Sequence, residues 1–116
     1  MKRVYVAGAY SADNVLEVLQ NIGRGEAVAA TLFAEGYAPF CPWHDKDFCI
    51  KLPDQDFTIQ QFYDYSIAWL KVSDGVFLVP GWEKSKGTLS EIEIASGIGI
   101  PIFDCVNDLF NYEWRY

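Results

Sequence analysis

The chain is poor in the residues that hold metals and form disulfides. It has one histidine and three cysteines, Cys41, Cys49 and Cys105, which show no repeated spacing. An odd number of unevenly spaced cysteines argues against a disulfide framework and favours a reducing, cytoplasmic environment. The interval from Cys41 to Cys49 is not a metal-ligand spacing, and one histidine makes a zinc site improbable. These counts predict no zinc site, and the function predicted below needs no metal and no cofactor.

Basic residues are also scarce. Nine Lys and Arg face sixteen Asp and Glu, which gives a net charge of −7. Binding to a nucleic-acid polymer depends on Lys and Arg that neutralise phosphates, so such a partner is not expected. A single small phosphate remains possible, because backbone N–H groups and a helix dipole can bind it.

Long apolar runs are missing. The N-terminal Met1-Lys2-Arg3 leads into only about five apolar residues, too few for a signal peptide. Nothing approaches the roughly 20 apolar residues of a membrane span. No membrane partner is expected. The 116 residues, 51% of them hydrophobic, suit one domain over residues 1–116 with a substantial core.

Short β-type runs alternate with helical patterns along the chain. Buried strands are predicted at Val4–Ala7, Tyr37–Cys41, Gly75–Val79 and Ile100–Phe103. Helices are predicted at Asp13–Glu35, Thr58–Val72, Thr88–Ile98 and Asn107–Tyr112. Gly23 and Gly25 weaken the first helix and could break it, and Gly36 stands where a C-terminal cap belongs. Pro42–Asp56 is predicted to be a long irregular loop, a kind of segment that is often functional.

This alternation predicts an α/β fold. Right-handed βαβ units give a doubly wound, Rossmann- or flavodoxin-like parallel sheet, with strand order about 2-1-3-4 and helices on both faces. Ligands bind such sheets where the strand order reverses, at the carboxyl ends of the strands. Residues 8–11 and 80–87 leave the two strands at that point, so they should face one another across one crevice.

The segment that leaves the third strand carries the most informative chemistry. Gly81, Ser85 and Gly87 lie in a polar loop that opens into a helix, and a helix N-terminus after such a loop is a ready anion site. Thr88 and Glu91 fit a capping box, in which Glu91 would bond to the Thr88 amide. The alternative is that Glu91 is a catalytic carboxylate beside the anion site. The loop lacks the Lys-Ser/Thr pair of a Walker motif.

Four other residues have both structural and functional interpretations. His44 is either a loop hydrogen-bonding residue or a catalyst, and Trp43 either covers the core or stacks on a base. Tyr5 lies inside the first strand, where it either packs in the core or reaches a carboxylate at the strand end. Asp64 lies within the second helix, and its default role is on a solvated face.

Together these residues identify a family resemblance that covers nearly the whole chain. The sequence resembles the nucleoside 2-deoxyribosyltransferase superfamily, and looks closest to its small bacterial and phage members and to the 2′-deoxynucleoside 5′-monophosphate N-glycosidases. The residues that carry the resemblance are Val4–Gly8, Asn21-Ile22, Gly36–Pro42, Ala68–Leu70, Ser73–Gly75, Pro80–Trp82, Ser85–Gly87, Glu91, Ala95 and Gly99–Pro101. The block from Trp69 to Ala95 is the more specific part.

The resemblance implies a mechanism and a set of roles. Glu91 matches the glutamate that attacks C1′ of the sugar and displaces the base, as in retaining glycosidases. Tyr5 matches the tyrosine that orients this glutamate, and Gly8, Ala9 and Tyr10 match the loop that lines the sugar site. The resemblance also implies a homodimer or higher homo-oligomer, for which the aromatic residues Phe110, Tyr112, Trp114 and Tyr116 could provide an interface.

Two positions refine the expected substrate. Ser85 stands where the transferases typically have an aspartate that contacts the 5′-hydroxyl and where the nucleotide hydrolases have a serine that contacts the 5′-phosphate. A serine can donate to a phosphate that an aspartate would repel. Ser66 stands where the family usually has an aspartate that assists at the sugar or the leaving base. Either Asp64 or an aspartate of the long loop substitutes for it, or the chemistry is slower or different.

The predicted function is hydrolysis of the base–sugar bond of a (deoxy)nucleoside 5′-monophosphate, with Trp43 and His44 as candidates for the base pocket. Three alternatives stay open. One is a transferase that exchanges bases. The second is a cytokinin-type phosphoribohydrolase, whose glycine loop is echoed by Pro80-Gly81 and Gly87-Thr88. The third is a nucleotide-binding sensor or accessory protein that has lost turnover, which Ser66 keeps in consideration.

Overall fold

The structure is a computed structural model that describes residues 1–114 of the chain. Its centre is a four-stranded parallel sheet formed by β1 (Arg3–Ala7), β2 (Ala38–Phe40), β3 (Gly75–Leu78) and β4 (Ile102–Phe103). The strand order is β2-β1-β3-β4. The predicted α/β fold and its strand order are therefore confirmed.

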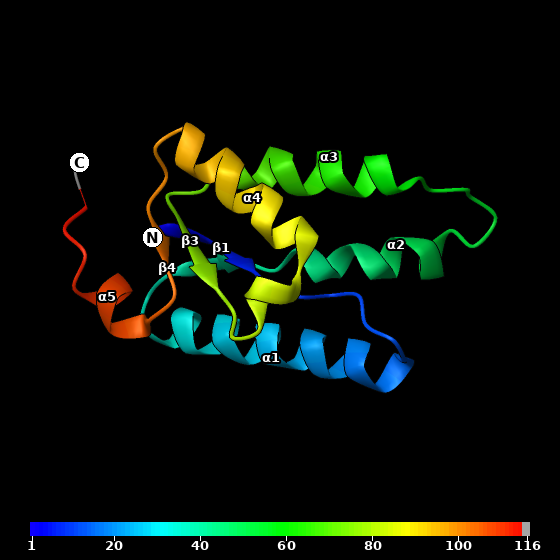
Figure 1. Cartoon of the computed structure of the whole chain (residues 1–116), viewed down its shortest axis with the longest axis horizontal. Helices are drawn as coiled ribbons and strands as arrows, with labels where there is room; N and C mark the ends of the chain where they lie inside the picture. The colour runs from blue at the N-terminus through cyan, green and yellow to red at the C-terminus, as the bar shows by residue number, and fades with distance from the viewer. Residues whose placement is uncertain (115–116) are drawn as a thin grey trace.

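Helices cover both faces of the sheet (Figure 1). One face is covered by α1 (Val15–Ala34), and the other by α3 (Ile59–Leu70) and α4 (Lys86–Gly97). The short α5 (Val106–Phe110) follows β4. The side chains of β1 alternate between the two faces of the sheet, so this strand contributes to the core on both sides. Val4 and Val6 belong to a core cluster with Ile22 and Leu32 of α1, whereas Tyr5 and Ala7 belong to a second cluster with Leu70 and Ala95.

The first helix continues through both of its inner glycines, so the suggested break is absent. It begins after the Asn14 cap, whose side chain accepts from the Glu17 amide at 2.9 Å, and it ends before Gly36, whose φ is +92°. Gly25 has a packing role, because a Cβ atom there would collide with ring carbons of Trp43. Glycine at this position lets the indole lie directly on the helix backbone.

The segment predicted as an irregular loop is partly helical. Pro42–Asp45 forms a 3₁₀ turn, η1, and Lys46–Lys51 forms a short helix, α2. Pro42 favours this start because its φ is already helical and its missing N–H is not needed in the first turn. Another 3₁₀ turn, η2 (Trp82–Lys84), lies between β3 and α4 and was also not predicted.

The C-terminal aromatic residues pack on the sheet edge of their own chain. The centroid of the Tyr112 ring lies 5.1 Å from that of Phe103 and 4.8 Å from that of Trp114. The Phe110 and Tyr37 rings stack with their centroids 5.7 Å apart. These three side chains contact aromatic rings of their own chain, and their role at an interface between subunits stays a prediction. Tyr116, the fourth member of the predicted interface, lies outside the described residues.

Candidate active site

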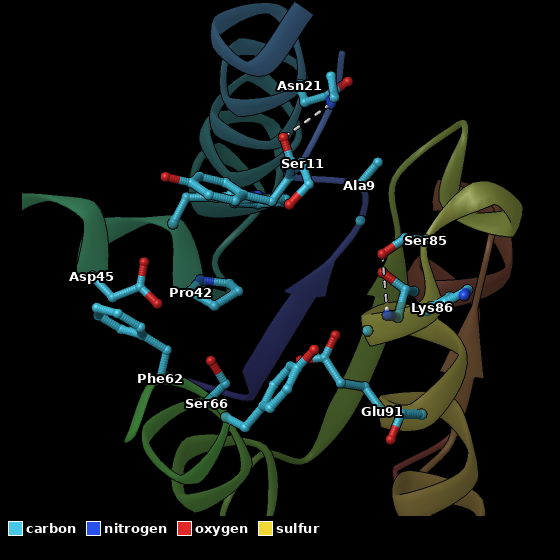
Figure 2. A pocket seen from close by; sticks show the side chains of 18 of the residues that line it. Ala9, Ser11, Asn21, Pro42, Asp45, Phe62, Ser66, Ser85, Lys86 and Glu91 are labelled. Atoms are coloured by element: carbon cyan, nitrogen blue, oxygen red, sulfur yellow. Dashed lines mark hydrogen bonds between the residues drawn. The ribbon is translucent and has the colours of Figure 1, made fainter. Parts of the chain in front are cut away.

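A large open cavity lies at the carboxyl ends of β1 and β3, where the strand order reverses (Figure 2). Its volume is about 1220 Å³. The two loops predicted to face one another both line it: Gly8, Ala9, Tyr10 and Ser11 from β1, and Gly81, Lys84, Ser85 and Gly87 from the segment after β3. The remaining wall comes from α1, from η1 and α2, and from α3 and α4. This is the position at which a doubly wound sheet binds ligands.

A tyrosine and a glutamate meet beneath this cavity. Tyr5 is fully buried in β1, and its hydroxyl donates a hydrogen bond to Oε2 of Glu91. Glu91 lies on α4 and lines the cavity. The contact joins the centre of the sheet to the helix that follows β3. Tyr5 thus belongs to the core and also reaches a carboxylate, so both interpretations of this residue apply.

The environment of this pair changes the ionisation of both groups. Burial raises the pKa of the Glu91 carboxyl to about 7, while the hydrogen bond from Tyr5 lowers it. Burial, and after it the negative charge of Glu91, raises the pKa of Tyr5 far above its usual range. The tyrosine therefore remains a hydrogen-bond donor across the physiological range, and Glu91 is poised between its neutral and ionised forms near pH 7.

The capping box predicted for Thr88 and Glu91 is wrong. The helix begins two residues earlier than predicted, at Lys86, and its N-cap is Ser85, whose Oγ accepts from the Thr88 amide at 3.2 Å. Ser85 is three residues before Thr88, the predicted start, and a serine with an extended backbone is a favoured N-cap. This leaves Glu91 free of any capping role and available to Tyr5. Thr88 is buried, and within residues 1–114 its Oγ1 has no hydrogen-bond partner.

The N-terminus of α4 forms the polar end of the cavity. Gly81 is left-handed at φ +95°, which turns the chain from β3 into η2. A side chain at Gly87 would meet only Ser85 Oγ, at 3.9 Å, so the helix backbone is accessible there. The first amides of a helix have no intrahelical partner, and this end carries the positive pole of the helix dipole. Lys84 and Lys86 flank Ser85 and also line the cavity, which sequence reasoning had not singled out.

The loop after β1 is held close to the sheet. A Cβ atom on Gly8 would lie 2.8 Å from Cβ of Val79, so glycine permits the close approach of the two strand ends. Asn21, nearly buried on α1, donates to the Tyr10 carbonyl at 3.2 Å and accepts from Arg24. Sequence reasoning had assigned no role to Arg24, whose cationic side chain adds positive charge to the cavity lining.

Three candidate substrate-site residues, Trp43, His44 and Asp64, contribute less to the cavity than predicted. Trp43 reaches the cavity only as part of its wall, because its ring is buried against Gly25 in the core. His44 is exposed and does not line the cavity, since η1 turns its side chain away from it. Asp64 is exposed on α3, where it accepts from Gln60 at 2.8 Å, and it does not line the cavity either. The aromatic residues that do line it are Tyr10, Trp43, Phe62 and Tyr63.

Two negative findings accompany this site. Within residues 1–114 no group of three or more His, Cys, Asp or Glu side chains is arranged to hold a metal ion. Among the helices of the same residues, none has the length and apolar character required to cross a membrane.

The fold and the position of the cavity define an α/β protein with a ligand site at the switch point of its sheet. Residues 2–104 match the family described as "Domain of unknown function (DUF4406)", and the chain belongs to that family. No curated protein matches the chain in sequence.

A solved structure of a 2-deoxyribosyltransferase from the psychrotolerant bacterium Bacillus psychrosaccharolyticus is similar in fold. The TM-score is 0.64 and the sequence identity 19%, over 97% of this chain and 93% of that chain. The resemblance to the deoxyribosyltransferase-like fold is therefore confirmed across nearly the whole chain.

Proposed function

We propose that this protein is an N-glycosidase that hydrolyses the base–sugar bond of a nucleoside 5′-monophosphate, with 2′-deoxyribose as the expected sugar. The observation that carries the proposal is the Tyr5–Glu91 pair, which borders the same cavity as the N-terminus of α4. One part of the cavity offers a carboxylate for the sugar carbon, and another offers backbone and side-chain donors for a phosphate.

Glu91 is the nucleophile in this proposal. Its ionised Oε attacks C1′, the C1′–N bond breaks, and its electron pair leaves with the base. Water then attacks C1′ of the glycosyl ester, and Glu91 departs as a carboxylate. The Tyr5 hydroxyl holds the carboxylate in place and favours its ionised form.

The 5′-phosphate is proposed to bind at the N-terminus of α4. The hydroxyl proton of Ser85 remains available because its oxygen accepts, rather than donates, in the cap. The amides near Gly87 and the side chains of Lys84 and Lys86 supply further positive potential. Tyr10, Phe62 and Tyr63 replace Trp43 and His44 as the residues expected to contact the base.

A base-exchanging transferase is the second candidate, and the fold of the similar 2-deoxyribosyltransferase favours it. The first chemical step would be the same, and a second base would take the place of water.

A homo-oligomer is also proposed. The cavity is wide and open, and Val15, Leu16 and Leu19 expose apolar side chains on the end of α1 beside it.

One experiment tests the main proposal. The protein is incubated with ribo- and deoxynucleoside 5′-monophosphates and with the matching nucleosides, and free base is measured by chromatography. Base release from monophosphates that is abolished in Glu91→Ala and retained in Glu93→Ala supports the proposal, because Glu93 is exposed on the same helix and does not line the cavity.

The other outcomes separate the alternatives. Release that requires an added second base indicates a transferase. Saturable binding of monophosphates without release, in wild type and Glu91→Ala alike, would overturn both enzyme readings and indicate a sensor.

A further inference from the structure

A second carboxyl group, Asp45, enters the cavity from the side opposite Glu91. Figure 2 shows the two side chains pointing toward a shared central space, with Ser66 of α3 between them. Asp45 ends η1, the turn that follows the carboxyl end of β2. The topology therefore brings residues from three separate segments to one reaction space.

Asp45 differs from the other acidic residues of the cavity wall. Asp13 and Glu17 are exposed, whereas Asp45 and Glu91 are both partly buried. The charge of Asp45 also reaches into the site: after burial, it adds to the raised pKa of Tyr10, and it makes the smallest contribution to the raised pKa of Tyr5. Among the cavity-lining acids of residues 1–114, Asp45 and Glu91 are the two placed to act on one bound molecule.

The surroundings of Asp45 favour its protonated form more than water does. Burial raises the pKa of this carboxyl above its ordinary value, and the neighbouring Lys46 and His44 act in the opposite direction. Tyr10, from the loop after β1, and Phe62 and Pro42 also stand near it in the cavity wall. A raised pKa is the direction that a proton donor to a leaving group requires.

We propose that Asp45 is the catalytic acid that protonates the departing base. This inference rests on the proposed N-glycosidase function and assigns the second of its two carboxyl roles. Cleavage of a glycosidic bond by a carboxylate nucleophile commonly uses a second carboxyl for the leaving group. As the C1′–N bond breaks, the proton of Asp45 passes to a ring nitrogen of the base, which leaves neutral. When water attacks the glycosyl ester, the Asp45 carboxylate accepts the proton of that water, so both groups return to their starting states.

The structure favours Asp45 over the other side chains considered for this role. Asp64 is on the exposed side of α3 and bonds to Gln60. Ser66 lies in the cavity, but its hydroxyl interacts with Tyr5, and an alcohol does not release a proton near neutral pH. Asp45 combines a titratable group with access to the cavity.

The first test compares Asp45→Asn with Asp47→Asn. Asp47 is an exposed neighbour on α2 that does not line the cavity. On the best monophosphate substrate, Asp45→Asn is expected to lower kcat by about 10²–10⁴-fold with little change in KM, and Asp47→Asn to leave both constants unchanged. Equal kcat values for Asp45→Asn and wild type would overturn the proposal. Asp45→Ala is a second variant at this position. Thermal unfolding of Asp45→Asn and Asp45→Ala distinguishes a folding defect from a catalytic one.

The second test changes the leaving group. The base of a 7-methylguanine nucleotide is cationic at pH 6 and departs without needing a proton. Asp45→Asn should therefore cleave it at a rate within about threefold of wild type, while Glu91→Ala remains inactive toward it. An equal loss on this nucleotide and on the ordinary one would show that Asp45 acts only through structure.

A third readout is the pH profile. Two catalytic carboxyls give a bell-shaped dependence of kcat/KM on pH, whose limbs belong to the pair. Asp45→Asn should leave a single titration. Failure of the proposed function can be told apart from failure of the Asp45 assignment. If the proposed function is wrong, wild type releases no base from either nucleotide. If only the Asp45 assignment is wrong, wild type and Asp45→Asn are equally active.

Discussion

Tyr5 of β1 and Glu91 of α4 are separated by 86 residues and joined by one hydrogen bond, donated by the tyrosine hydroxyl. The tyrosine ring belongs to the core beneath the sheet, and the glutamate carboxylate borders the cavity. This contact ties the packing of the domain to the proposed chemistry, because the strand holds Glu91, the proposed nucleophile, in position.

The first prediction concerns the ionisation of Glu91. Its carboxyl should titrate at a pH of about 7 in the folded protein. Tyr5→Phe removes a hydrogen bond that favours the ionised form, so the pKa of Glu91 should rise in that variant. NMR of protein labelled with ¹³C at glutamate carboxyls measures both values, and Glu91→Gln identifies the signal. A Glu91 resonance that titrates near the ordinary glutamate value would contradict the prediction.

The second concerns stability. Since burial raises the Glu91 pKa from 4.5 to about 7, the folded state holds a proton that the unfolded state has lost over this range. Stability should therefore fall as pH rises from about 4.5 to 7 and level off above it. Glu91→Gln removes this dependence and should be more stable than wild type at pH 8 by up to about 3 kcal/mol. Urea unfolding at pH 5 and pH 8 tests this, with Glu93→Gln as the control.

The third separates the two roles of Ser85. Ser85→Ala loses the cap on the Thr88 amide and should cost about 1 kcal/mol of stability. Ser85→Asp preserves a favourable cap but places a negative charge at the proposed phosphate site. It should keep near-wild-type stability while kcat/KM for monophosphates falls relative to nucleosides. Unchanged preference for monophosphates in Ser85→Asp would remove this residue from the phosphate site.

The fourth concerns Thr88, whose buried Oγ1 has no partner within the described chain. Thr88→Val has nearly the same shape and removes an unsatisfied polar atom, so thermal unfolding should show equal or higher stability. Thr88→Ser keeps the hydroxyl but loses a buried methyl group, and it should be destabilised. A marked loss of stability in Thr88→Val would mean that the hydroxyl is satisfied in the folded protein.

The fifth uses two glycines of α1 as a matched pair. Gly25→Ala places a methyl group against the Trp43 ring and should destabilise the protein by about 1–3 kcal/mol. Gly23→Ala meets no atom within 4 Å and should stabilise the helix by about 0.5–1 kcal/mol. Chemical denaturation of both variants gives opposite signs if Trp43 packs as described. Equal effects of the two substitutions would contradict that packing.

Much of the fold and part of the site could be predicted from local pattern. The alternation of short apolar strands with helical periodicity predicted the parallel sheet and its order, and the two loops at the switch point followed from that order. Tyr5, Ser85 and Glu91 were predicted on pattern and resemblance. In the structure Ser85 and Glu91 line one cavity and Tyr5 bonds to Glu91 from the core, although their roles remain predictions. The helix start was wrong because Ser85 and Thr88 are both acceptable caps in sequence.

Only the tertiary structure decided which side chains share the cavity. The direction of an aspartate in a loop depends on how that loop folds, and η1 and α2 were not visible in the hydrophobic pattern. They turn Asp45 into the cavity and leave His44 exposed, and the helical register of α3 places Asp64 outside. The sequence by itself determined the sheet and the location of its crevice, because these depend on periodicity and chain direction. The hydrogen bond between Tyr5 and Glu91, and the position of Asp45 across the cavity from Glu91, depend on contacts between distant segments. Periodicity does not encode such contacts.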